Sequence, residues 1–207
     1  MSKTIIFDFD GTIADSFLIA LDVLYGLTHR DRPLPEEDIS RLRGMSNREV
    51  LQELHIPLWR VPLLLIGARR RLHTRLGEIG LIPGIDDSLR NLHQRYKLFV
   101  LSSNSFDNIE SFLIRFGIRN YFVGIYSSAH PLWKERKLKK LLQDQCLVPH
   151  DVWYVGDEAQ DIVAAHKVGL NSVAVAWGYN NVHALESQHP EALVFNPDEL
   201  TRCFYDN

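Results

Sequence analysis

Two aspartates separated by one residue stand at the end of the first apolar segment of the chain. Asp8 lies in the β-branched and aromatic run 4–9, and Asp10, Gly11 and Thr12 follow this run directly. Side chains alternate along a strand, so an extended chain would place both carboxyl groups on one face, and Gly11 permits a sharp turn after them. Two carboxylates this close repel each other, and a bound cation relieves that repulsion. The pair therefore indicates a site for Mg²⁺, which prefers oxygen ligands, with an ordinary capped turn as the alternative.

Small polar side chains follow a second apolar run, residues 98–101. Ser102, Ser103 and Asn104 come directly after it. Hydroxyl groups and free backbone N–H groups at the end of a strand suit the oxygens of a phosphate group. The same residue types are common in turns and caps, so the pattern by itself is compatible with both interpretations.

Three acidic residues follow a third apolar run, residues 152–155. Asp157, Glu158 and Asp161 lie just after Gly156. Acidic groups at a junction between strand and helix can hold a cation or cap the helix N-terminus. Capping accounts for one of them more readily than for all three, and a metal site and a capped helix both remain open.

A lysine begins the predicted helix 134–146. Lys134 opposes the helix dipole at this end, which is a local cost that a role facing phosphate would explain. The basic residues after it are expected to face water, because Leu138 and its neighbours at helical spacing form an apolar stripe. Lys137 is the fallback candidate for the same role.

Strands that alternate with helices must position these clusters. Buried strands are predicted for the β-branched and aromatic runs 4–9, 98–101, 122–126, 152–155 and 172–175. This alternation predicts an α/β fold, a Rossmann-like parallel sheet with helices on both faces. Ligands of such sheets bind beyond the carboxyl ends of the strands, where three of the polar clusters stand.

Residues 16–82 interrupt the alternation with amphipathic helical segments that contain no predicted strand. Pro83 and Gly84 mark the return to the alternating pattern. We therefore predict an α/β core formed by residues 1–15 and 83–207, and an inserted helical cap formed by residues 16–82.

The predicted cap contains a polar loop with candidate specificity residues. Arg43, Asn47 and Arg48 could reach over the site, and arginine pairs well with a carboxylate or a second phosphate. A polar loop that caps the next helix is the alternative.

Composition excludes several classes of function. The 207 residues carry a formal net charge of −3, which argues against nucleic-acid binding. Cys146 and Cys203 lie far apart and outside any CxxC pattern, which is typical of a reducing compartment. No apolar stretch reaches the roughly 18 residues of a membrane helix, and no signal-peptide pattern begins the chain. We expect a soluble cytoplasmic protein without a membrane or nucleic-acid partner.

Taken in order, these clusters resemble the signature of the haloacid dehalogenase (HAD) superfamily, in particular its phosphoglycolate phosphatase-like and phosphomutase-like branch with a small helical cap. The likeness covers almost the whole chain. The matching positions are Asp8-x-Asp10-Gly11-Thr12, Ser102, Lys134 in the form Lys-x-x-x-Leu, and Gly156-Asp157 with Asp161. The chain departs from many relatives at Glu158, where they carry a small residue, so Glu158 is a ligand or a bystander.

The resemblance implies a role for each position. Asp8 would be the nucleophile that forms an aspartyl-phosphate, and Asp10 would protonate the leaving alcohol and then deprotonate water. Mg²⁺ would be held by Asp8, the backbone carbonyl of Asp10, and Asp157. The phosphoryl oxygens would be bound by Thr12, Ser102, Ser103, Asn104 and Lys134, with support from Glu158 and Asp161.

The function expected from this resemblance is Mg²⁺-dependent hydrolysis of a small phosphate monoester, such as phosphoglycolate or a sugar phosphate. The partner is then a small phosphorylated metabolite. A phosphomutase with the same site, or a regulatory or structural protein of the same fold with low activity, are the alternatives.

Overall fold

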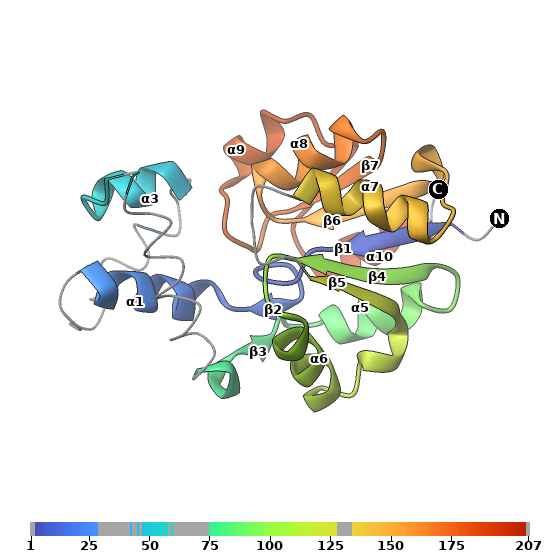
Figure 1. Ribbon diagram of the computed structural model, residues 1–207, viewed down its shortest axis with the longest axis horizontal. Helices are drawn as coiled ribbons and strands as arrows, with labels where there is room; N and C mark the ends of the chain where they lie inside the picture. The colour runs from blue at the N-terminus through green and yellow to red at the C-terminus, as the bar shows by residue number, and fades with distance from the viewer. Residues whose placement is uncertain are drawn as a thin grey trace.

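A six-stranded parallel sheet forms the centre of the molecule (Figure 1). The computed structural model describes residues 3–28, 42, 45, 47–57, 59, 75–127 and 134–205. The strands lie in the order β5-β4-β1-β6-β7-β8. In chain order they are β1 (Thr4–Phe7), β4 (Lys97–Ser102), β5 (Phe122–Ser127), β6 (Val152–Gly156), β7 (Asn171–Val175) and β8 (Ala192–Val194). This arrangement confirms the predicted α/β fold.

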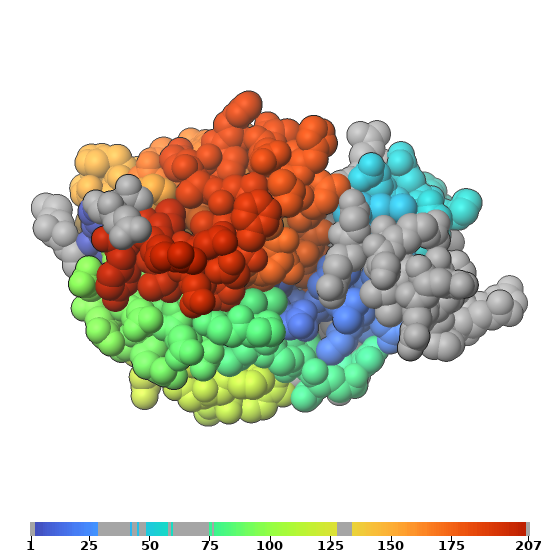
Figure 2. All heavy atoms as spheres, turned by 180° about the vertical axis from the view of Figure 1, so that it is seen from behind, coloured from blue at the N-terminus to red at the C-terminus, as the bar shows by residue number. Residues whose placement is uncertain are grey.

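Helices cover both faces of the sheet. They are α5 (Ile85–Leu92), α6 (Phe106–Arg115), α7 (Lys134–Asp144), α8 (Ala159–Lys167), α9 (Val182–Glu186) and α10 (Pro197–Tyr205), with 3₁₀ turns η2 (Leu76–Glu78), η3 (Arg119–Tyr121) and η5 (Pro149–Asp151). Buried side chains of α5, α6 and α10 pack on one face, and those of α7 and α8 pack on the other. Figure 2 shows the first of these faces, with α10 in red beside α5 in green.

Alternation along β1 explains why the sheet needs both layers. Ile5 and Phe7 belong to the cluster that includes α5, α6 and α10, whereas Ile6 belongs to the cluster under α7 and α8. All three side chains are fully buried. A strand that is apolar on both faces reads as a continuous hydrophobic run, which is the pattern seen in the sequence.

A short ribbon links the sheet to a second, smaller group of helices. Strand β2 (Ala14–Asp15) pairs antiparallel with β3 (Gly80–Leu81), and the chain between them includes α1 (Phe17–Thr28) and α3 (Asn47–Glu53). These helices lie to the left of the sheet in Figure 1 and share a separate apolar cluster with Leu42 and Ile56. The separate cluster supports the division into a core and a cap of residues 16–82, which remains our proposal.

Three short strands were not among the predicted elements. β2 and β3 have two residues each and β8 has three, too few to display a period of two. Backbone pairing with distant partners defines them, and β3 lies inside the segment predicted to lack strands. The predicted helix 134–146 ends earlier, at Asp144, and Cys146 then adopts a positive φ of 50°. In the described part of the chain, no helix has the length and apolar character needed to cross a membrane.

Packing of α7 on the sheet makes a first prediction. Leu138 is fully buried among residues of β1, β4 and β6, so Leu138→Ala should lower the free energy of unfolding by about 2–5 kcal/mol, measured by urea denaturation. The matched control on the same helix is Lys140→Ala. Lys140 is exposed and pairs with Asp144 in water, so its loss should leave the midpoint of urea denaturation close to that of wild type. Equal effects of the two variants would contradict this packing.

Candidate active site

Asp8 lies where β1 ends, between the ends of β4 and β6. Phe7 pairs with Val100 on one side and Val155 on the other, and the backbone N–H of Asp8 donates to the Val155 carbonyl at 2.8 Å. The chain then turns sharply at Gly11, whose φ is 80°, a conformation that favours glycine. This turn leaves the Asp8 side chain buried, with 6% of the residue exposed, at the carboxyl edge of the sheet.

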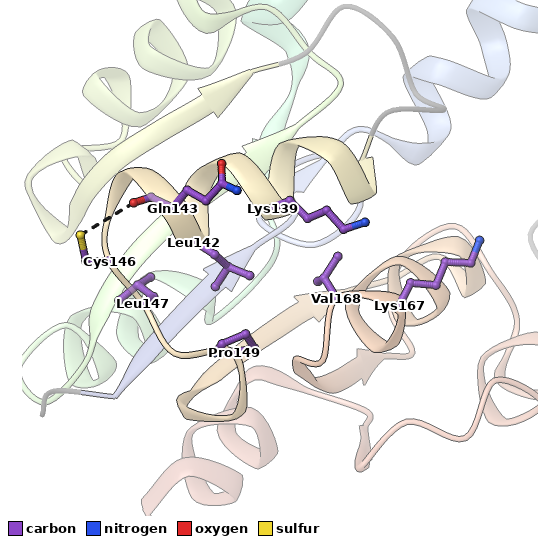
Figure 3. A pocket seen from close by; sticks show the side chains of 8 residues that line it. All are labelled: Lys139, Leu142, Gln143, Cys146, Leu147, Pro149, Lys167 and Val168. Atoms are coloured by element: carbon purple, nitrogen blue, oxygen red, sulfur yellow. Dashed lines mark hydrogen bonds between the residues drawn. The ribbon is translucent and has the colours of Figure 1, made fainter.

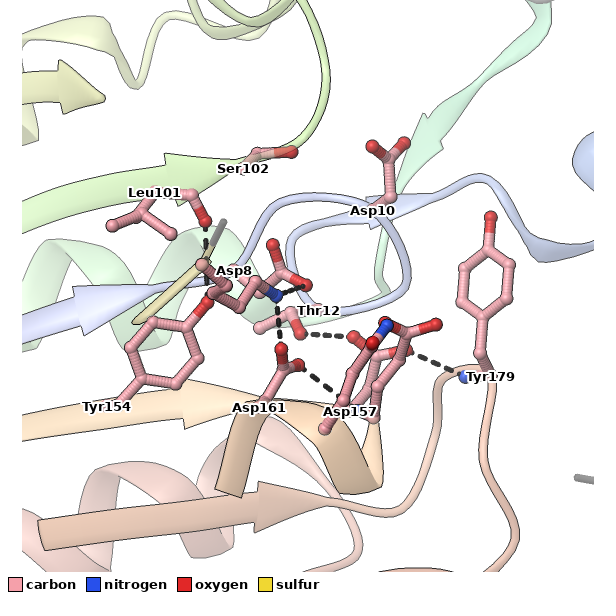
Figure 4. Close-up of polar contacts among 12 residues, drawn as sticks. Asp8, Asp10, Thr12, Leu101, Ser102, Tyr154, Asp157, Asp161 and Tyr179 are labelled. Carbon is pink, nitrogen blue, oxygen red and sulfur yellow. Dashed lines mark hydrogen bonds and ion pairs between the residues drawn. The ribbon is translucent and has the colours of Figure 1, made fainter. Parts of the chain in front are cut away.

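Lys134 joins Asp8 to the acidic cluster after β6. Its Nζ donates to Asp8 Oδ2 at 3.0 Å and also forms an ion pair with Asp161 (Figure 4). Burial acts to lower the pKa of Lys134, but the negative charges of Asp161 and Asp8 outweigh burial and raise that pKa well above its ordinary value. The ammonium group therefore stays charged and cancels part of the negative charge around it.

Three buried carboxylates converge beside this lysine. Asp8, Asp157 and Asp161 each offer one oxygen within 4.8 Å of the others, a grouping that could hold a metal ion. Burial, followed by the charge of Asp8, raises the pKa of Asp157 well above its ordinary value. Uncompensated negative charge and an all-oxygen donor set are the features that Mg²⁺ suits, so these residues fit that ion.

Asp157 is held in one position from several sides. The Thr12 hydroxyl donates to its Oδ1 at 2.6 Å, and the backbone N–H of Tyr179 donates to its Oδ2 at 2.8 Å. Glycine backbones close the pocket around the carboxylate: a Cβ added to Gly11 would stand 2.2 Å from Oδ2, and one added to Gly178 would stand 2.2 Å from Cβ of Asp157. The structure therefore uses the Thr12 hydroxyl to hold Asp157.

Sequence reasoning missed the loop that follows β7. The backbones of Gly178 and Tyr179 lie against the Asp157 side chain, and the Asn180 side-chain oxygen accepts from the backbone N–H of Ala159 at 2.8 Å. These residues form no spaced pattern with the acidic cluster. The available signal was their position after an apolar run, at the same sheet edge as the other clusters.

Asp10 and Asp157 lie on opposite sides of the turn that follows β1 (Figure 4). The Asn104 side-chain amide donates to Asp10 Oδ2 at 3.1 Å. Burial and then the charge of Asp8 raise the pKa of Asp10 to about 6, partly opposed by hydrogen bonds from Asn104 and Ser16. A carboxyl group with such a pKa can donate and accept a proton near neutral pH.

The polar segment after β4 faces the same edge. Ser102 is buried, and its hydroxyl oxygen accepts from the backbone N–H of Asn104 at 3.0 Å. Ser103 beside it is half-buried. Asn104 also accepts from the side-chain amide of Asn108 at 2.9 Å, so α6 holds the side chain that donates to Asp10. The structure thus brings Ser102 and Asn104 to the first aspartate pair.

The other candidate residues are Asp161, Glu158 and Lys137, and each makes different contacts. Asp161 caps α8 as well, because its Oδ2 accepts from the backbone N–H of Glu158 at 3.2 Å, whereas the Glu158 carboxylate accepts from the side chain of Gln160. Lys137 donates instead to the Ser127 carbonyl at 2.8 Å. It is therefore Lys134 that reaches Asp8.

The candidate specificity residues are not placed by the structure. Arg43 lies outside the described residues. Asn47 and Arg48 belong to α3, but their side chains also lie outside what is described.

A shallow hollow of about 530 Å³ lies away from this site, between the C-terminal parts of α7 and α8 (Figure 3). Its floor is apolar, and Lys139 and Lys167 stand at its rim. Lys139 donates to Glu135 at 2.7 Å, so its charge is already matched. None of the three buried carboxylates lines this hollow. The candidate active site is therefore the group of carboxylates at the sheet edge.

Comparison with known proteins agrees with this geometry. Residues 5–175 match the family described as haloacid dehalogenase-like hydrolase. The chain belongs to that family. A phosphoglycolate phosphatase of Synechococcus elongatus is 37% identical over 204 residues, covering 97% of this chain and 96% of the relative. Within the haloacid dehalogenase-like hydrolases, the protein is therefore an enzyme of phosphatase type.

Further similar proteins match at lower sequence identity. A phosphoglycolate phosphatase of Agrobacterium fabrum is 25% identical and covers 100% of this chain and 94% of the relative. The solved structure of a predicted phosphatase from Clostridium acetobutylicum matches with a TM-score of 0.82 at 21% identity, over 100% of both chains. A haloacid dehalogenase-like hydrolase from Streptococcus pneumoniae matches with a TM-score of 0.79 at 22% identity, over 98% of both chains.

The pocket around Asp157 makes a second prediction. Gly178→Ala should displace the Asp157 side chain and lower the free energy of unfolding by about 1–3 kcal/mol, because the added methyl group would overlap Asp157. Urea denaturation measures the loss, and a crystal structure of the variant would reveal the displacement. Gly80→Ala is the control, since nothing lies within 4 Å of its Cβ. Full stability of Gly178→Ala with Asp157 unmoved would contradict this packing.

Proposed function

We propose that the protein is a Mg²⁺-dependent phosphatase that hydrolyses a small phosphate monoester through a phosphorylated Asp8. The observation that carries the proposal is the position of Asp8, buried at the sheet edge, 3.0 Å from the Lys134 ammonium and grouped with Asp157 and Asp161. Phosphoglycolate is the substrate that we propose first, because the relative that is 37% identical is named a phosphoglycolate phosphatase.

The reaction divides one displacement into two. A carboxylate oxygen of Asp8 attacks phosphorus, the bond from phosphorus to the alcohol oxygen breaks, and Asp10 gives that oxygen a proton. Asp10, now a carboxylate, then takes a proton from water while the water oxygen attacks the same phosphorus. Asp8 leaves as a carboxylate and inorganic phosphate is released, so Asp10 returns to its protonated form. The pKa of about 6 for Asp10 suits both directions of proton transfer.

Charge neutralisation is the second requirement of phosphoryl transfer. Lys134 would bind phosphoryl oxygens with its ammonium group, and Ser102 with Ser103 would donate hydrogen bonds at the same edge. Asp8 and Asp157 would hold Mg²⁺ together with the backbone carbonyl of Asp10, with Asp161 in support. Bound there, the ion would supply positive charge to the phosphoryl oxygens.

The cap would control access to this edge. Helices α1 and α3 form their own apolar cluster beside the sheet, and the short two-stranded β2–β3 ribbon flanks the segment that contains them. Closure of the cap over the substrate would exclude water from the phosphoryl group and limit the substrate to a small molecule.

The nucleophile and the metal make a third prediction. Wild-type protein with Mg²⁺ should release inorganic phosphate from phosphoglycolate, and EDTA should abolish that release. Asp8→Asn should lower kcat by at least about a thousandfold, because the amide cannot attack phosphorus. Asp198→Asn, which changes an exposed aspartate on α10, should behave as wild type.

The panel for this assay should contain sugar phosphates and nucleotide monophosphates beside phosphoglycolate. Release that persists in Asp8→Asn would exclude an aspartyl-phosphate at this position. Formation of an isomeric phosphate ester without net release would identify a phosphomutase instead.

The two candidate lysines make a fourth prediction. Lys134→Ala should lower kcat/KM by about a hundredfold or more, because a buried positive charge next to the phosphoryl group is lost. Lys137→Ala should stay within about threefold of wild type, since its ammonium group donates to the Ser127 carbonyl. Steady-state kinetics with phosphoglycolate distinguishes them, and the reverse order of effects would refute the assignment.

A further inference from the structure

The loop after β7 carries a tryptophan whose side chain reaches the turn after β1. The Trp177 indole N–H donates to the backbone carbonyl of Thr12 at 3.2 Å. The ring is half-buried and packs against the apolar cluster under α5, α6 and α10. Trp177 therefore joins two segments that are 165 positions apart in the sequence, and it does so without touching the carboxylates that the proposed reaction uses.

The same two segments supply the donors that hold Asp157. The Thr12 hydroxyl donates to Oδ1 at 2.6 Å from the turn after β1, and the Tyr179 backbone N–H donates to Oδ2 at 2.8 Å from the loop after β7. Figure 4 shows the two donors reaching the carboxylate from either side. The direction of this carboxylate therefore depends on the spacing between the turn and the loop.

Trp177 is placed to fix that spacing. It lies in the same loop as Tyr179, and its indole binds the carbonyl of the residue whose hydroxyl holds Oδ1. Thr12 is fully buried, so its carbonyl cannot exchange the indole for water without a change in the packing around it. One indole thus holds the two donors of Asp157 at a set distance from each other.

The ends of the loop are anchored through backbone contacts. The Ala176 N–H donates to the Val194 carbonyl at 2.9 Å, and the Asn180 N–H donates to the Asp157 carbonyl at 3.2 Å. Neither contact involves a side chain of the loop, so both remain when Trp177 is substituted. A substitution of Trp177 should therefore affect the middle of the loop and leave its ends in place.

We propose that Trp177 is a positioning residue for Asp157, the proposed metal ligand. By joining the loop after β7 to the turn after β1, it sets how the Asp157 carboxylate faces Asp8 and Asp161. This inference rests on the proposed function, specifically on Mg²⁺ held by Asp8 and Asp157. Partners that hold a metal ligand from behind typically change metal affinity by about 10- to 100-fold when they are removed.

Trp177→Phe removes the indole N–H and keeps an aromatic ring on the apolar cluster. Calorimetric titration of the metal-free protein with Mg²⁺ should give an affinity about tenfold weaker than that of wild type, because the lost donor acts through Thr12. With phosphoglycolate, the Mg²⁺ concentration at half-maximal rate should rise by a similar factor. The kcat at saturating Mg²⁺ should stay within about threefold of wild type, since Asp8, Asp10 and Lys134 keep their contacts.

Trp153→Phe is the matched control, because it makes the same change on β6. Trp153 is also half-buried, packs against the same apolar cluster and lies edge-on to Phe204, with ring centroids 5.5 Å apart. The smaller ring should lower the stability of the metal-free protein in urea about as much as Trp177→Phe does, while the Mg²⁺ affinity stays at the wild-type value. The comparison separates a role at Asp157 from a loss of packing.

Thr12→Val extends the test along the same path, because it removes the hydroxyl and keeps the carbonyl that the indole binds. It should also weaken Mg²⁺ binding about tenfold. The double variant with Trp177→Phe should weaken binding by less than the product of the two single effects, since both act on Asp157 through Thr12. If Trp177→Phe does not fold, Trp177→Tyr takes its place, because that side chain also lacks the indole N–H and keeps an aromatic ring.

The outcomes separate the two proposals. A wild-type Mg²⁺ affinity in folded Trp177→Phe, an equal loss of affinity in Trp153→Phe, or single effects that multiply in the double variant would overturn the positioning role. If the wild-type protein binds Mg²⁺ but releases no phosphate from any ester of the panel, the proposed function fails, and the calorimetric comparison still decides the role of Trp177. If it binds no Mg²⁺, the positioning role fails as well.

Discussion

Burial of several carboxylates around one ammonium group is the constraint on which the rest of the site depends. Asp8, Asp157 and Asp161 are almost entirely removed from water, and Lys134 forms ion pairs with two of them, Asp8 and Asp161. A buried charge without a partner costs several kcal/mol, so this cluster persists only because the surrounding structure holds it in place. The excess of negative charge makes the same place receptive to a divalent cation, and it explains the raised pKa of Asp157.

The parallel sheet is what allows these groups to meet. Asp8, Ser102 and Asp157 stand at the ends of three neighbouring strands, β1, β4 and β6, whose registers align. Helix α7 then begins with Lys134 at the same edge, where its charge opposes the helix dipole. That local cost is offset by ion pairs with Asp8 and Asp161, which explains a lysine where an acidic residue would suit the helix better.

Two glycines and the loop after β7 fix the position of the Asp157 carboxylate. Gly11 and Gly178 leave room for Asp157 that no larger residue would leave, and the Thr12 hydroxyl and the Tyr179 N–H fix its two oxygens. The Tyr179 side chain then reaches the start of α1. The loop after β7 therefore contacts both the acidic cluster and the first helix beside the sheet.

Local patterns in the sequence determined the α/β fold, the strand ends that carry polar clusters, and the positions of Asp8, Asp157 and Lys134 as candidates, because period and turn chemistry are properties of neighbouring residues. They favoured Lys134 and kept Lys137, three residues further along the same helix, as a fallback; packing directs Lys134 to Asp8 and Lys137 to Ser127. The loop after β7 was not predicted as part of the site, because its contacts with the site also depend on packing between distant residues. The hydrogen bond from Thr12 to Asp157 joins residues 145 positions apart, and the one between Tyr179 and Ser16 joins residues 163 apart. Contacts over such separations arise only when the sheet aligns distant strand ends, and that alignment is a property of the tertiary structure.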